Sequence, residues 1–138
     1  MNTNEKPPET KDRKVILSTL WIFVIFNYLY VDVAMVSFHP EVYQRAAARM
    51  TEGLVLGASV LMEIPIAMIL LSRVLKYRTN RWANIIAGVV STAFAAFPLF
   101  TGKPPAFYLL FSIIEIACTL FIVWYAWTWP KPEAQNSE

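Results

Sequence analysis

The chain has 138 residues, of which 57% are hydrophobic and 14% aromatic, and its formal net charge is +2. This length allows one compact unit and excludes a second domain of ordinary size. The single cysteine, Cys118, excludes an intrachain disulfide and a cysteine-based metal cluster, and no cofactor is expected. No nucleic-acid partner is expected either, because membrane topology explains the basic residues.

Four apolar segments lie between a polar tail at 1–14 and a second polar tail at 130–138. They cover residues 15–38, 53–72, 82–100 and 106–129. A helix of this length, rising 1.5 Å per residue, crosses about 30 Å of hydrocarbon. Four such helices cannot share one water-facing surface, so the sequence predicts an all-α integral membrane protein. The most economical arrangement is a four-helix bundle in up-down-up-down order.

The first apolar segment carries polar side chains near its middle and towards its end. Tyr28 and Asp32 are four residues apart and therefore share one helix face, with Asn27 beside them. The loop that follows, residues 39–52, contains a predicted short interfacial helix. This helix should begin at Pro40, because proline is favoured in the first turn.

The second apolar segment contains SVLMEIPIAMILLSR, which places an acid and a proline inside an apolar run. Glu63 lies near the middle of the segment and shares a helix face with Ser59 and Glu52. Pro65 leaves the carbonyl of Leu61 without its usual donor and predicts a kink. The freed carbonyl and Glu63 could together form a polar notch.

Small residues predict where helix backbones approach one another. Gly53 and Gly57 have the four-residue spacing typical of close helix contacts. In the third segment a narrow face is predicted for Ala87, Gly88, Ser91 and Ala95. Just before and at the start of that segment, a polar and aromatic cluster predicts interfacial anchoring and helix capping: Asn80, Arg81, Trp82 and Asn84.

The fourth apolar segment carries a polar stripe with 4-3-4 spacing, which places its members on one helix face. The stripe consists of Tyr108, Ser112, Glu115 and Thr119. Glu115 lies close to the middle of the segment. Like the other polar stripes it is expected to face inward, because a central acid facing lipid costs about 2.5–3.5 kcal/mol.

Basic residues predict the orientation of the bundle. Only Arg45, Arg49 and Lys103 lie on the side of the two predicted outer loops. The other side has a threefold excess, formed by Lys6, Lys11, Arg13, Lys14, Arg73, Lys76, Arg78, Arg81 and Lys131. Because cytoplasmic segments carry the excess of lysine and arginine, both termini are predicted to be cytoplasmic.

The inward stripes predict one central pocket lined by Glu63, Glu115, Asn27 and Asp32. No basic residue lies at that depth, so the acids are expected to be neutral, hydrogen-bonded or sharing a proton. The candidates for proton exchange or acid–base chemistry are Glu63, Glu115 and Asp32. The candidates for ligand binding are Asn27, Tyr28, Ser59, Ser91, Ser112 and Thr119, and no metal ligand is predicted.

Two stretches resemble an uncharacterised family of small bacterial four-span inner-membrane proteins. They are LSTLWIFVIFNYLYVD (17–32) and LMEIPIAMILLSRVLKYRTNRWANIIAG (61–88). The resemblance implies four spans and a multi-pass location in the bacterial inner membrane. It implies no activity and no residue roles.

Three functions fit the pattern. The favoured one is proton-linked binding or transport of a small polar or cationic molecule through the central carboxylates. The alternative is an intramembrane acid–base enzyme, of isomerase, cyclase or hydrolase type, on a lipidic or isoprenoid substrate. The third is a non-catalytic accessory subunit whose polar core specifies assembly. The lipid bilayer is the expected partner, and a small-molecule ligand and a homo-oligomer are both compatible with the pattern.

Overall fold

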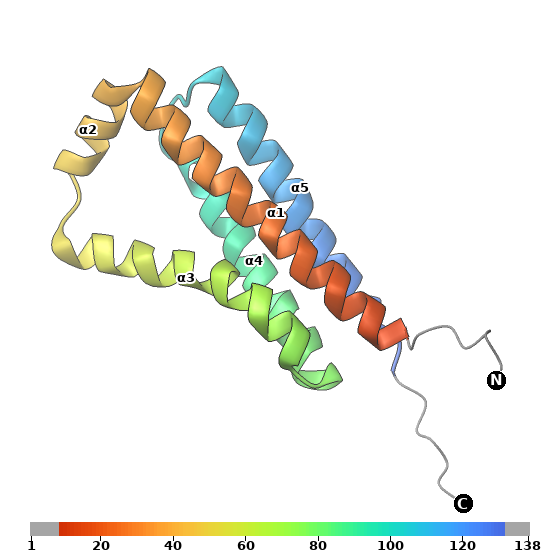
Figure 1. Cartoon of the computed structure of the whole chain (residues 1–138). Coiled ribbons are helices and arrows are strands. Elements are labelled where there is room, and N and C mark those ends of the chain that lie inside the picture. Colours follow the sequence, from red (N-terminus) through yellow and green to blue (C-terminus); the bar gives the residue numbers. More distant parts are fainter. Residues whose placement is uncertain (1–8, 132–138) are drawn as a thin grey trace, which may run out of the picture.

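The computed structural model describes residues 9–131, which form five α-helices. Their bounds are α1 Glu9–Phe38, α2 Pro40–Ala48, α3 Glu52–Val74, α4 Tyr77–Thr101 and α5 Ala106–Trp127. All except α2 are long and apolar enough to cross a membrane. The four long helices pack into a bundle (Figure 1), so the predicted all-α bundle is confirmed.

Local sequence signals determine where several helices begin. Pro40 occupies the first turn of α2, as predicted. The hydroxyl of Thr51 accepts a hydrogen bond of 3.3 Å from the backbone N–H of Leu54 and so caps α3. Pro105 precedes α5, where the missing proline N–H costs nothing.

Two helices begin earlier than the apolar segments indicate. α1 begins at Glu9 rather than near residue 15, and α4 begins at Tyr77 rather than near residue 82. The link between α3 and α4 is therefore only Leu75 and Lys76. An apolar segment in the sequence indicates only the part of a helix that lies in the hydrocarbon of the membrane. The helix itself can extend past the membrane, because polar side chains there reach water.

The bundle brings the described start of α1 and the end of α5 to the same end, and α2 lies at the opposite end (Figure 1). α4 packs most extensively against α5, and α1 against α3. The first half of α3 diverges from the other helices, and Figure 1 shows the bend near the middle of α3. Pro65 lies inside this helix and removes one backbone hydrogen bond there, which accounts for the bend.

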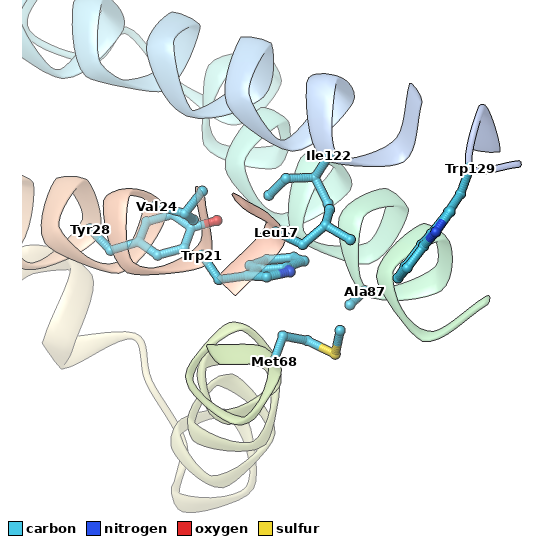
Figure 2. Packing of buried hydrophobic residues seen from close by; sticks show 8 residues of the cluster. All are labelled: Leu17, Trp21, Val24, Tyr28, Met68, Ala87, Ile122 and Trp129. Carbon is cyan, nitrogen blue, oxygen red and sulfur yellow. The ribbon is translucent and has the colours of Figure 1, made fainter. Parts of the chain in front are cut away.

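The apolar core lies in the half of the bundle nearest the termini. Trp21 of α1 is fully buried at its centre, between Met68 of α3, Ala87 of α4 and Ile122 of α5 (Figure 2). Burying a large aromatic side chain contributes about 1.5–3 kcal/mol where water is the alternative. In a bilayer the gain comes from close packing instead.

A buried hydrogen-bond network joins three helices beside this core. The indole Nε1–H of Trp21 donates to Oδ1 of Asn84 at 2.7 Å, and the Ser72 hydroxyl donates to the same oxygen at 3.2 Å. The Asn84 amide donates in turn to the backbone carbonyl of Asn80 at 2.9 Å and to its Oδ1 at 2.6 Å. Asn80 and Asn84 are completely buried and do not cap the start of α4 as predicted; Asn80 donates instead to the carbonyls of Ser72 and Leu75 at the end of α3, at 2.6 and 3.4 Å.

Arginines from two helices hold the end of α5. Arg13 donates from Nη1 to the carbonyl of Tyr125 at 2.9 Å, and its guanidinium lies 4.4 Å from the centre of that ring. Arg81 donates from Nη2 to the carbonyl of Trp127 at 3.0 Å. Cations at a helix C-terminus satisfy free carbonyls and complement the helix dipole.

α4 and α5 approach each other closely at Gly88. A Cβ atom added there would lie 2.6 Å from Cγ2 of Val123 and 3.2 Å from the backbone oxygen of Thr119. Gly53 and Gly57, in contrast, have no atom within 4 Å of such a Cβ. The predicted narrow face of α4 is therefore confirmed, whereas the predicted close contact at Gly53 and Gly57 is not formed within the chain.

Replacing Gly88 with leucine is expected to lower the free energy of unfolding by about 3 kcal/mol, because α5 must move away. The measurement is reversible unfolding in detergent, followed by circular dichroism. Gly57→Leu is the matched control, since it adds the same side chain to α3 where space is open. Equal stability of the two variants would contradict the packing of α4 against α5 described here.

Candidate functional site

The polar stripe of α5 faces the interior, as predicted. Ser112, Glu115 and Thr119 are buried, and Tyr108 is half-buried. Only 4% of the Glu115 surface is exposed, and its Oε1 atom has no hydrogen-bond partner among the described residues. Glu115 is thus an acid in the middle of a span with unused hydrogen-bonding capacity.

The hydroxyl groups of Thr119 in α5 and Thr92 in α4 bond to each other and to backbone carbonyls, not to the Glu115 carboxyl. The hydroxyl oxygens of Thr119 and Thr92 lie 2.7 Å apart and link α5 to α4. When Thr92 donates its hydrogen to the backbone carbonyl of Gly88 at 2.7 Å, Thr119 donates its own to Thr92; the Thr119 hydroxyl also lies 2.9 Å from the backbone carbonyl of Glu115. These bonds hold the backbone of α5 in place beside the acid.

Three further side chains interact electrostatically with Glu115. Tyr28, Tyr108 and Asp32 lie close enough to Glu115 for an electrostatic interaction, and Asp32 also lies close enough to Tyr108. Tyr28 is buried, and its hydroxyl also has no hydrogen-bond partner among the described residues. We call Glu115, Asp32, Tyr28 and Tyr108 the Glu115 group.

Asp32 connects this group with an open cavity. The cavity has a volume of about 520 Å³ and lies between α1, α2 and α3, on the half of the bundle away from the termini. Asp32 lines it from α1 and Ser59 from α3, and Tyr43 belongs to the wall that α2 forms. The Asp32 side chain is exposed and forms no ion pair with any described residue.

Contrary to the prediction from the sequence, Glu63 and Ser59 do not lie in the packed interior of the bundle, although Ser59 lines the open cavity. Both side chains are exposed, and Ser59 donates its hydroxyl hydrogen to the carbonyl of Val55 in its own helix at 2.8 Å. α3 buries the face with Pro65, Met68 and Ser72. Glu63 precedes Pro65 by two residues, about 200° around the helix, and is therefore not on the buried face of α3.

The expected central pocket with all four polar groups is therefore not formed. The acid that acts on Glu115 is Asp32, not Glu63. Asn27 is buried but donates to the carbonyl of Phe23 in its own helix at 2.8 Å. It lines a separate apolar groove of about 540 Å³, whose wall includes Tyr30 and Phe111.

The remaining candidate, Ser91, is buried on the α4 face that includes Ala87 and Ala95. Within residues 9–131 no three histidine, cysteine or acidic side chains lie close enough together to hold a metal ion. The chemistry of the Glu115 group is that of carboxyl and phenol groups. Such groups can exchange protons, accept hydrogen bonds and bind a cation.

Sequence reasoning missed the wall of the cavity. Tyr43 and Met50 come from α2 and its end, and Met62 comes from α3. The pattern of α2 predicted an interfacial helix and gave no sign that it encloses a space. The bend of α3 and the position of α2 beside the end of α1 create the cavity.

These features define the class of protein. Four membrane-length helices indicate a multi-pass membrane protein, and the bundle contains a buried carboxylate at Glu115. The sequence model of a family of unknown function, DUF6326, matches residues 8–136, and the chain belongs to this family. Comparisons with curated proteins and with solved structures give no match.

Proposed function

We propose that this protein binds and carries a small cationic molecule across the bacterial inner membrane in exchange for protons. The observation that carries the proposal is the buried Glu115 carboxyl, whose Oε1 lacks a hydrogen-bond partner among the described residues. An acid at this depth is costly and, where it occurs, commonly belongs to an ion or proton pathway. Both termini lie in the cytoplasm in this proposal, in accord with the distribution of basic residues.

The two acids have different roles in the proposal. Asp32 meets the ligand first, because it lines the open cavity. Glu115 lies inside the bundle, close enough to Asp32 for an electrostatic interaction. A cation held near Asp32 favours the ionised form of Glu115, so arrival of the ligand releases a proton, and uptake of a proton releases the ligand.

The test is transport by purified protein in sealed liposomes with an imposed pH gradient. The probe is radiolabelled 4-phenylbutylguanidinium, which stays charged and so does not cross the bilayer as a free base. Uptake is expected to exceed that of protein-free liposomes and to require the gradient. Uptake equal to that of protein-free liposomes, or independent of the gradient, would refute the proposed function.

A further inference from the structure

The cavity beside Asp32 has a distinct chemical character. Its wall contains one acid and no basic residue, although Arg45 and Arg49 are close by in the sequence. A volume of about 520 Å³ lies within the usual range for small-molecule sites, about 300–1,000 Å³. Charge complementarity with its wall therefore favours a ligand with one positive charge.

The remaining wall is apolar and adaptable. Met50, Met62, Tyr43, Val55 and three alanines surround the space that Asp32 and Ser59 reach from two sides. Methionine side chains are flexible and polarizable and fit apolar groups of different shape. The ligand should therefore carry an apolar arm as well as a charge.

The polar groups also distinguish between kinds of cation. A primary ammonium has three N–H donors, and here it can donate to the Asp32 carboxylate and to the Ser59 hydroxyl oxygen, whose own hydrogen is donated to Val55. A quaternary ammonium has no donors and is bound best by several aromatic rings. Tyr43 is the one aromatic residue in this wall, so the primary ammonium is favoured.

We propose that the cavity between α1, α2 and α3 binds an amphiphilic primary ammonium ion, with Asp32 as its counter-ion and the two methionines and Tyr43 around its apolar arm. This inference rests on the proposed function for its biological purpose. It names the ligand class and the place where that ligand binds. Asp32 is the residue that determines specificity for the charge.

The experiment is equilibrium binding of radiolabelled 4-phenylbutylammonium to the full chain in nanodiscs of zwitterionic lipid. Saturable binding is expected, and 4-phenylbutanol, which lacks the charge, should compete about tenfold more weakly or worse. The trimethylammonium analogue should also compete more weakly than the primary amine. Equal competition by the alcohol, or no saturable binding, would overturn the inference without any variant.

Two variants locate the site. Asp32→Asn keeps the size of the side chain and is expected to weaken amine binding about tenfold while leaving the weak binding of the alcohol unchanged. Ala47→Phe fills the cavity and should weaken binding of both compounds. Glu52→Gln removes an exposed acid outside the cavity wall and should bind as the wild type does. Wild-type affinity in either Asp32→Asn or Ala47→Phe would overturn the inference.

The outcomes separate this inference from the proposed function. Saturable, Asp32-dependent binding without transport would leave the ammonium site in place and refute the carrier. Gradient-driven transport that persists in Asp32→Asn with unchanged affinity would leave proton-linked transport in place but refute both the ammonium site and the role given to Asp32.

Discussion

Replacing Asn84 with alanine is expected to lower the free energy of unfolding by about 2–3 kcal/mol, a large effect for one polar side chain. Asn84 takes part in four hydrogen bonds, to Trp21, to Ser72 and twice to Asn80. In membrane proteins such bonds average about 0.6 kcal/mol each. Four of them lost together, in a completely buried place, account for the expected change.

The measurement is unfolding in mixed micelles with increasing dodecyl sulfate, followed by helical circular dichroism. Thr19→Val is the matched control, because the Thr19 hydroxyl is exposed and bonds to the carbonyl of Val15 in its own helix. It should change stability by less than about 0.5 kcal/mol. An Asn84→Ala protein as stable as the control would show that the network does not hold α1, α3 and α4 together.

Replacing Glu115 with glutamine is expected to reduce gradient-driven transport about a hundredfold, since a proton-exchanging group typically contributes about 10²–10⁴-fold. Glutamine keeps the size of the side chain and its hydrogen-bonding capacity but cannot ionise. The protein should therefore fold normally, with a melting temperature close to that of the wild type. Transport in sealed liposomes and thermal melting in detergent measure the two effects side by side.

Glu63→Gln is a stringent control for this prediction. Glu63 lies in the middle of its span, yet its side chain is exposed and is not on the buried face of α3. The Glu63→Gln protein should therefore transport at nearly the wild-type rate. Comparable losses in both variants would instead support a role for two central glutamates acting together, which the observed faces of α3 and α5 do not favour.

The bundle could be predicted from the sequence because the length of the apolar segments indicates the spanning helices and the spacing of polar residues indicates their buried faces. Apolar length predicts each spanning helix, and the 4-3-4 spacing places Ser112, Glu115 and Thr119 on one buried face. The small residues of α4 are buried for the same reason. Helix starts were less predictable, because α1 and α4 continue beyond the apolar segments.

The site could be predicted only in part. Spacing defines which residues share a face, but it does not say which face of a bent helix meets the bundle. α3 turns Pro65, Met68 and Ser72 inward, so Glu63 and Ser59 are exposed despite their regular spacing. Asp32 lies near Glu115 because α1 packs against α5. The packing of one helix against another cannot be predicted from the residue spacing within either helix alone.

The most direct test of the account is proton release when the cation binds. Purified protein in weakly buffered nanodiscs, with a pH-sensitive dye, is titrated with 4-phenylbutylguanidinium until binding saturates. We expect release of up to about one proton per bound cation from the wild type, and none from Glu115→Gln, although that variant still binds the cation. Saturable binding without proton release from the wild type, or the same release from Glu115→Gln, would contradict it.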